Sequence, residues 1–250
     1  MELTPDLEAR HFDAQERLAR MGSYYRWILN NFRGAIGRRV WDAGAGIGSV
    51  SALLAEEADF LLATEFTEHN LAALRERFAG RADVRVEFCD LTRQEALAFA
   101  GLELDTIVTL DVLEHLDDDA RALATYFAVL RPGGRLCAKV PAHPFLYGTL
   151  DEASLHYRRY ARRELGRKLA AAGFEVERLR HMNMAATVPY FLKGRVLKKK
   201  TGSFSTSIDG SKLGFYDRLI PWLERVERLV PPPFGLSLVA IARKPGAKSA

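Results

Sequence analysis

The 250-residue sequence has few cysteines, no long apolar run and only a small excess of positive charge. Its two cysteines, Cys89 and Cys137, lie far apart in apolar segments, and we expect both to be reduced thiols in the core of a cytoplasmic protein. No stretch approaches the roughly 18 consecutive apolar residues that a membrane-spanning helix requires. The first residues lack the basic and then apolar pattern of a secretion signal. We therefore expect neither a disulfide-stapled secreted protein nor a membrane-spanning one.

Hydrophobic residues make up 48% of the chain and charged residues 27%, which is typical of a globular protein with a substantial core. The net charge is +4, and basic residues concentrate between Arg158 and Lys200, ending in Lys198-Lys199-Lys200. Such a cluster can meet a phosphate, a nucleic acid or an anionic membrane, or it can be a solvated basic face. Because no aromatic residues alternate with these cations, we expect no nucleic-acid partner.

The periodicity of apolar residues predicts an α/β protein. Residues 1–37 have helical spacing and form a helical leader, and from residue 38 onward short apolar runs alternate with amphipathic stretches. This alternation is typical of a mostly parallel, doubly wound sheet with helices on both faces. Strands are expected near 39–43, 60–64, 84–88, 105–110 and 135–140, and helices over 48–57, 68–78, 92–99, 118–130 and 161–172.

Two more strands are expected at 174–181 and 236–242, so residues 182–233 form an insertion or lid within a domain covering 38–250. The insertion contains an amphipathic helix over 215–230, which we expect Pro221 to interrupt. Its apolar residues can line an acceptor pocket, face a membrane or belong to the core; they are Met182, Met184, Tyr190, Phe191 and Leu192. Peripheral membrane contact through 182–230 is one expectation.

A glycine-rich turn follows the first expected strand. Asp42 ends that strand, and Gly44-Ala45-Gly46-Ile47-Gly48 leads into a helix, which allows a ligand to approach the backbone closely. A tight strand-to-helix turn without a ligand would have the same pattern. Ser49 stands where a dinucleotide-binding loop has its last glycine, which disfavours an NAD-dependent oxidoreductase.

Acidic residues end the next three strands as well. Glu65 is placed to accept hydrogen bonds from the hydroxyls of a ribose, and Asp90 can accept one from the amino group of an adenine. Asp111 ends the fourth strand. Together with Asp42 they would gather like charges at one edge of the sheet, which is costly unless a ligand satisfies them. S-adenosylmethionine has the amino, sulfonium and hydroxyl groups to do so. The residues therefore favour this cofactor, although each acid could also be a helix N-cap.

With these motifs the chain resembles the class I S-adenosylmethionine-dependent methyltransferases of the type 11/12 group. The matching segments are VWDAGAGIG, ATEF, FCDL, DTIVTLDVLEHLDDD and LRPGGRLCAKVPAHP. The resemblance implies a Rossmann-like seven-stranded sheet whose last strand is antiparallel, and S-adenosylhomocysteine as the product. The residues expected to bind the cofactor are Tyr24, Asp42, Gly44, Ala45, Gly46, Glu65, Phe66, Asp90, Leu91, Asp111 and Val112.

The segments VPAHPFLYGTLDEASLHYRRYARREL and PPPFGLSLVAIARKP resemble a narrower subgroup that is often encoded beside family 2 glycosyltransferases. This resemblance implies a small-molecule, natural-product, or lipid- or sugar-linked acceptor. A general base is optional for methyl transfer, and His156 and His143 are the candidates, with Asp151 placed to orient the imidazole of His156. The alternative for both histidines is a structural role in the loop, with Arg158 or Tyr160 holding that loop to the sheet.

Asp111, Glu114 and His115 have a spacing that resembles the ligands of metal-using methyltransferases. Since a mixed oxygen and nitrogen site would need a further donor, we expect no metal and assign Glu114 and His115 to capping or shaping a helix. A partner-binding subunit that keeps the fold without catalysis is a further alternative to an enzyme. It would be expected to have a damaged cofactor edge, and here the motifs are intact.

Overall fold

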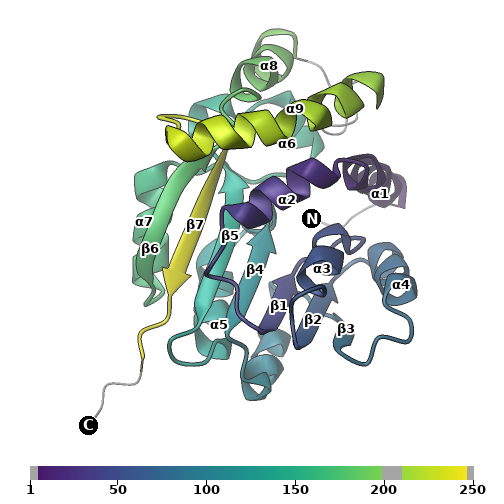
Figure 1. Ribbon diagram of the computed structural model, residues 1–250, viewed down its shortest axis with the longest axis vertical. Helices are drawn as coiled ribbons and strands as arrows, with labels where there is room; N and C mark the ends of the chain where they lie inside the picture. The colour runs from purple at the N-terminus through teal and green to yellow at the C-terminus, as the bar shows by residue number, and fades with distance from the viewer. Residues whose placement is uncertain (1–4, 199–209, 247–250) are drawn as a thin grey trace.

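Residues 5–198 and 210–246 are described by the computed structural model, and their centre is one seven-stranded sheet (Figure 1). The strands are β1 (Arg39–Ala43), β2 (Phe60–Glu65), β3 (Val84–Phe88), β4 (Thr106–Leu110), β5 (Arg135–Pro141), β6 (Glu175–Met182) and β7 (Ser237–Arg243). Their order is β3-β2-β1-β4-β5-β7-β6, and β7 runs antiparallel to both of its neighbours. The predicted fold class and antiparallel last strand are confirmed.

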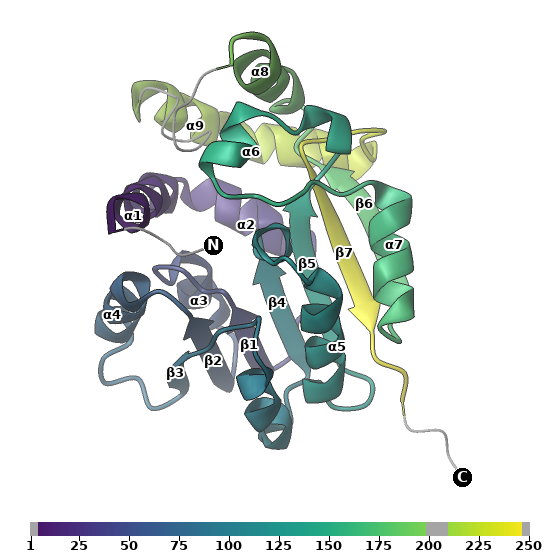
Figure 2. The same ribbon diagram turned by 180° about the vertical axis from the view of Figure 1, so that it is seen from behind.

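Helices cover both faces of the sheet because its central strands are apolar on both sides. One face packs against α2 (Gly22–Asn30), α3 (Ser49–Leu54), α4 (Glu68–Arg77) and α9 (Gly210–Leu229). The other face packs against η1 (Gln94–Leu102), α5 (Asp119–Val129) and α7 (Arg162–Ala171), which lie in front in Figure 2. The edge strand β6 instead exposes a row of charged side chains, which discourages pairing with another sheet.

Two helices differ from the sequence-based expectation. The helix predicted over 92–99 is present as the 3₁₀ helix η1, in which Ala96 and Phe99 are buried three residues apart, as three residues per turn require. The helix predicted to be interrupted at Pro221 is continuous, so that prediction is wrong. Proline has no backbone N–H, so one carbonyl in the preceding turn of α9 lacks its usual donor. Because Pro221 is exposed, water can bind this carbonyl instead.

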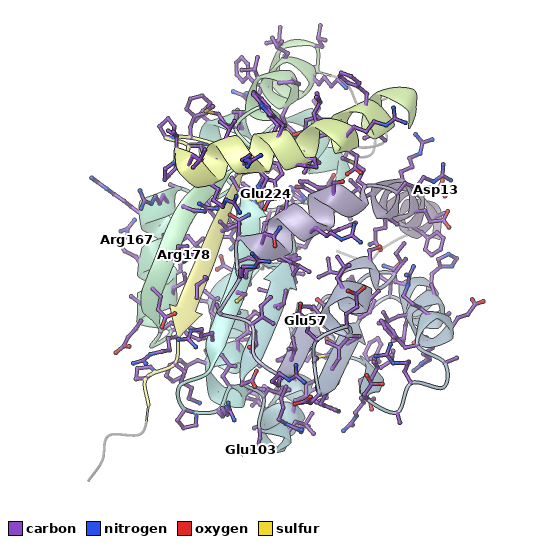
Figure 3. The ribbon with its side chains drawn as sticks, in the orientation of Figure 1. Asp13, Glu57, Glu103, Arg167, Arg178 and Glu224 are labelled. Atoms are coloured by element: carbon purple, nitrogen blue, oxygen red, sulfur yellow. The ribbon has the colours of Figure 1, made fainter. Side chains whose placement is uncertain are left out.

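The leader and the insertion meet over the carboxyl ends of β4 and β5 (Figure 1). The leader contains α1 (Pro5–Ala19) and α2, and the insertion between β6 and β7 contains α8 (Thr187–Phe191), the π-helix η4 (Leu192–Val196) and α9. Asp217 accepts a hydrogen bond from the backbone N–H of Tyr24, 193 positions away, at 3.2 Å. Glu224, between α9 and α2 in Figure 3, accepts one from Asn30 at 2.9 Å.

None of the helices within the described ranges is both long enough and apolar enough to cross a bilayer. The order of the strands locates a binding site more directly. From β1 the chain builds outward through β2 and β3, and it returns to the other side of β1 to build β4 and β5. Ligands of doubly wound sheets bind at such a switch point, at the carboxyl ends of the strands. Here the switch point lies between the ends of β1 and β4.

Candidate active site

The glycine loop after β1 has a backbone that only glycine adopts without strain. Gly44 has φ +83° and Gly46 has φ +56°. A Cβ atom on Gly44 would lie 2.4 Å from Cγ2 of Val112, and one on Gly46 would lie 2.6 Å from Oε1 of Gln15. The loop is therefore packed closely between β4 and the leader, and added side chains would fill the space beside it.

Glu65, at the end of β2, holds the loop in this shape. Its Oε2 accepts the N–H of Gly46 at 2.9 Å, and its Oε1 accepts the N–H groups of Phe66 at 2.9 Å and Thr67 at 3.2 Å. Burial raises the pKa of Glu65, and the three backbone donors act in the opposite direction. A carboxylate has about four lone-pair positions, so Oε2 retains the capacity to accept a ribose hydroxyl.

Asp42 lies beneath the glycine loop and is only 2% exposed. The hydroxyl of Ser51, from α3, donates a hydrogen bond to Oδ2 of Asp42 at 2.6 Å. Burial raises the pKa of Asp42 to about 7; the Ser51 hydrogen bond lowers it, and the nearby charge of Glu65 raises it. Asp42 can thus change its protonation state near neutral pH.

The remaining acidic strand ends have partners that reduce the expected repulsion. Asp90 pairs with Arg93 at 3.1 Å, and Asp111 pairs with the Nζ atom of Lys139 at 2.5 Å. Lys139 comes from the middle of β5 and is buried. Burial alone would lower the pKa of Lys139, but the charge of Asp111 outweighs this effect and the pKa is raised. Sequence analysis missed Lys139, although a lysine within the apolar run LCAKVP was a usable signal.

One cavity of about 850 Å³ brings the predicted cofactor residues together. All eleven of them line it: Tyr24, Asp42, Gly44, Ala45, Gly46, Glu65, Phe66, Asp90, Leu91, Asp111 and Val112. The leader closes part of this cavity, since Gln15 of α1 also lines it and accepts the N–H of Ile47 at 3.1 Å. No motif in the sequence marked Gln15. The size of the cavity is within the range of small-molecule and cofactor sites.

His156 lines the same cavity, and Asp151 is placed as expected to orient it. Asp151, in α6 (Thr149–Ala153), is fully buried, and its Oδ1 lies 3.0 Å from Nδ1 of His156 and 2.7 Å from Nε of Arg159. Burial would raise the pKa of Asp151, but the His156 hydrogen bond and the Arg159 charge hold it below its usual value. An ionised Asp151 accepts hydrogen bonds only, so Nδ1 carries the proton and Nε2 is the atom left for chemistry.

His143 is placed differently, because its ring does not line the cavity. It follows β5 with φ +63°, and its ring stacks on that of His181 from β6, with 4.9 Å between centroids. Burial, and then the charge of Arg159, lower the pKa of His143. The structure therefore does not bring His143 together with the predicted cofactor residues. Tyr160 does hold this loop to the sheet, through its N–H to the carbonyl of Pro141 at 2.9 Å.

The side chain of Glu114 does not cap or shape a helix through hydrogen bonds, as we had expected from the sequence. It lies in the short 3₁₀ helix η2 (Leu113–His115) and is fully buried, yet neither of its carboxylate oxygens accepts a hydrogen bond from the described part of the chain. Burial and the nearby charge of Asp111 raise its pKa well above the usual value. Its neighbour His115 lines the cavity.

The comparisons with known proteins point to a methyltransferase domain. Residues 41–136 match the family model of a methyltransferase domain. A probable S-adenosylmethionine-dependent methyltransferase of Mycolicibacterium smegmatis is 33% identical over 144 residues, which cover 56% of this chain and 53% of that protein. The ubiquinone/menaquinone biosynthesis C-methyltransferase UbiE of Desulfotalea psychrophila is 28% identical over 174 residues, which cover 66% of this chain and 68% of that protein. The chain spans about half the length of most of the curated relatives that it matches.

Solved structures share the fold at low identity. An S-adenosylmethionine-dependent methyltransferase from Mesorhizobium loti has a TM-score of 0.58 and 16% identity, covering 88% of this chain and 97% of that one. Phosphoethanolamine N-methyltransferase 2 of Haemonchus contortus, solved with S-adenosyl-L-methionine, has a TM-score of 0.59 and 19% identity, covering 89% and 52%. Residues 41–136, which contain the glycine loop and many of the residues that line the cavity, therefore match a methyltransferase domain, and the chain is similar to S-adenosylmethionine-dependent methyltransferases in sequence and in fold.

Proposed function

We propose that this chain transfers the methyl group of S-adenosyl-L-methionine directly to a small-molecule or lipid-linked acceptor. The observation that carries this proposal is the cavity itself, which joins all eleven expected cofactor residues to His115, His156 and Tyr157. Because the sulfonium is already an activated methyl donor, much of the rate can come from holding the acceptor in line with it. The cavity offers one continuous space in which cofactor and acceptor can meet.

The pair formed by His156 and Asp151 supports a hydroxyl as the acceptor group. Asp151 fixes the orientation of the imidazole, and Nε2 is then the atom able to receive a proton. In this proposal the acceptor oxygen forms a bond to the methyl carbon while its proton passes to Nε2. The electron pair of the broken carbon–sulfur bond stays on sulfur and gives S-adenosylhomocysteine. Several curated relatives are named as ubiquinone biosynthesis O-methyltransferases, which agrees with oxygen as the acceptor atom.

We also propose that the insertion contacts an anionic lipid surface, which would give access to lipid-linked acceptors. Exposed apolar side chains recur on α9 at intervals of three or four residues, at Phe215, Leu219, Trp222, Val226 and Leu229. Val188, Leu192 and Val196 of α8 and η4 are exposed as well, and this segment contains two cations, Lys193 and Arg195. Apolar side chains beside cations are suited to the interface of an anionic membrane. Lys199 and Lys200 of the predicted basic cluster lie outside the described residues.

Calorimetry with S-adenosyl-L-methionine and S-adenosylhomocysteine tests the main proposal. The wild-type chain should bind both, and Glu65→Gln should weaken binding by about tenfold or more, because one carboxylate oxygen that accepts hydrogen bonds is lost. Glu68→Gln is the matched control, since Glu68 is exposed at the start of α4 and should leave the affinity unchanged. Absence of binding at millimolar cofactor would overturn the proposal.

Co-sedimentation with lipid vesicles tests the membrane contact separately. The wild-type chain should bind vesicles that contain phosphatidylglycerol more than vesicles of phosphatidylcholine alone, and added salt should weaken binding. The double variant Phe215→Ser and Trp222→Ser should lose most of this binding while keeping cofactor affinity, because both side chains are 64% exposed. Equal sedimentation of the wild type and the variant would contradict the contact.

A further inference from the structure

We propose that Glu114, His115 and His156 bind a divalent cation beside the cofactor, and that the hydroxyl of the acceptor completes its coordination. This inference rests on the proposed methyl transfer and specifies its acceptor as a hydroxyl compound. It reverses our expectation from sequence, which did not include His156 among the ligands. The residues come from two separate segments, η2 and the loop after α6, and folding brings them together.

The first support is geometric. One ligand atom from each of the three residues lies within 4.8 Å of those from the other two. The rings of His115 and His156 are 4.7 Å apart between centroids and nearly perpendicular, at 87°. Donors that are each about 2.1 Å from one cation lie about 3.4 Å apart in a tetrahedral site. The three ligand atoms therefore need to close by at most about 1.4 Å to share an ion, which side-chain rotation can supply.

The second support is the uncompensated carboxylate of Glu114. It is fully buried, and neither oxygen accepts a hydrogen bond from the described residues. The charged groups that act on it are Asp111, Lys139 and Arg159, but Lys139 is paired with Asp111 and Arg159 with Asp151. Each nearby cation is thus already balanced by another acid. A buried carboxylate without a partner is costly, and a bound cation would remove that cost.

The third support is the hydrogen bond behind His156. Asp151 holds Nδ1 of His156 at 3.0 Å and is itself fixed by Arg159 at 2.7 Å and by the N–H of Gly148 at 3.0 Å. Metal-binding histidines commonly donate their second ring nitrogen to a carboxylate in this way, which fixes the tautomer and raises the basicity of the ligating nitrogen. Nε2 of His156 is therefore prepared as a ligand atom.

The ligand set indicates the kind of cation and its task. Two imidazoles and one carboxylate suit zinc and similar first-row cations better than magnesium, and three protein ligands leave a position open. A hydroxyl bound there loses its proton to solvent more readily, and its oxygen then takes the methyl group from the sulfonium, leaving the neutral thioether. Nε2 of His156 cannot both bind the cation and accept the proton. Glu114→Gln separates the two roles, because it should weaken cation binding only if Glu114 and His156 share an ion.

Cobalt(II), whose visible absorption reports its coordination, is the direct probe. After treatment with a chelator, the wild-type chain should bind one equivalent with a saturable spectrum. Glu114→Gln should weaken cobalt binding by about 100-fold or more, because it replaces the charged carboxylate ligand with a neutral amide. The same variant should keep wild-type affinity for S-adenosyl-L-methionine. Two matched controls, Glu57→Gln on the surface and His181→Ala in β6, should bind cobalt as the wild type does.

The outcomes separate this inference from the proposed function. Cofactor binding without saturable cobalt binding would overturn the cation site and leave the methyltransferase proposal standing. Wild-type cobalt affinity in Glu114→Gln would also overturn it and would favour His156 as the base. If the melting curve shows that Glu114→Gln does not fold, His115→Gln decides the matter by the same titration, because His115 is partly exposed at the wall of the cavity.

Discussion

The cofactor side and the acceptor side of the cavity are built in different ways. The cofactor side consists of short motifs at the ends of consecutive parallel strands, and backbone geometry in the glycine loop determines its shape. The acceptor side consists of the loop around α6 and the residues near η2, where buried charges hold one another in place. The cofactor side depends on glycines, which leave room beside the backbone, whereas the acceptor side depends on pairs of charged side chains. Substitutions on the cofactor side should therefore mainly weaken binding, and substitutions on the acceptor side should mainly lower stability and turnover.

The largest loss of stability is expected from Asp151→Asn on the acceptor side. The variant leaves the buried guanidinium of Arg159 without its carboxylate, and breaking such a pair costs about 3–5 kcal/mol. It also leaves one neutral oxygen where two carboxylate oxygens held His156, Arg159 and the N–H of Gly148, so His156 is oriented less firmly and turnover should fall by much more than cofactor affinity. Chemical denaturation and calorimetry measure the two effects. A large loss of cofactor affinity in folded protein would show that the two sides are not separable in this way.

A smaller loss of stability and a larger loss of binding are expected from Gly44→Ala on the cofactor side. The new Cβ would lie 2.4 Å from Val112 at a residue with φ +83°. The unfavourable φ and the overpacking together cost about 2–4 kcal/mol. Cofactor binding should be lost, while cobalt binding should persist in the fraction that is folded.

Gly214→Ala is the matched control for the loop glycine. Gly214 lies in α9, and a Cβ there would meet no atom within 4 Å. Alanine at this helical position should stabilise the chain by about 0.5–1 kcal/mol and leave cofactor binding unchanged. Equal binding by Gly44→Ala and Gly214→Ala would show that the glycine loop tolerates a side chain after all.

The same contrast explains how much the sequence could predict. The sequence could predict that the expected cofactor residues lie together, because most of them stand at a fixed place relative to a strand end and parallel strands end at one edge of the sheet. Gln15 and the unpaired state of Glu114 could not be inferred in this way, because they depend on how segments far apart in the sequence pack together. Lys139 could have been noticed as a lysine within an apolar run, but its partner Asp111 depends on the packing of β5 beside β4. His143 shows the opposite error. His143 directly follows a strand end, whereas His156 does not, and yet it is His156 that lines the cavity. The ring of His143 stacks on His181 instead.

The smallest effect expected among the residues that line the cavity is a pH dependence of stability caused by Asp42. Burial raises its pKa in the folded chain from the ordinary value of 3.8 to about 7. The folded state therefore holds this proton more tightly than the unfolded state. Stability from this group is fully present below about pH 4 and is lost as the pH rises through about 7, where the buried carboxyl ionises. Asp42→Asn removes the ionisation and keeps an oxygen that can accept the hydrogen bond of Ser51.

The free energy of unfolding of Asp42→Asn, relative to wild type, should therefore increase between pH 5 and pH 8. Each unit of pKa shift corresponds to about 1.4 kcal/mol, and water in the cavity should reduce the measured change to about 1–2 kcal/mol. Asp13→Asn, at an exposed position of α1, is the matched control and should show no such trend. A difference between Asp42→Asn and wild type that stays constant with pH would mean that Asp42 is ionised throughout. The carboxylate beneath the glycine loop would then be held in its ionised form, as Asp151 is on the acceptor side, and the contrast between the two sides would not extend to Asp42.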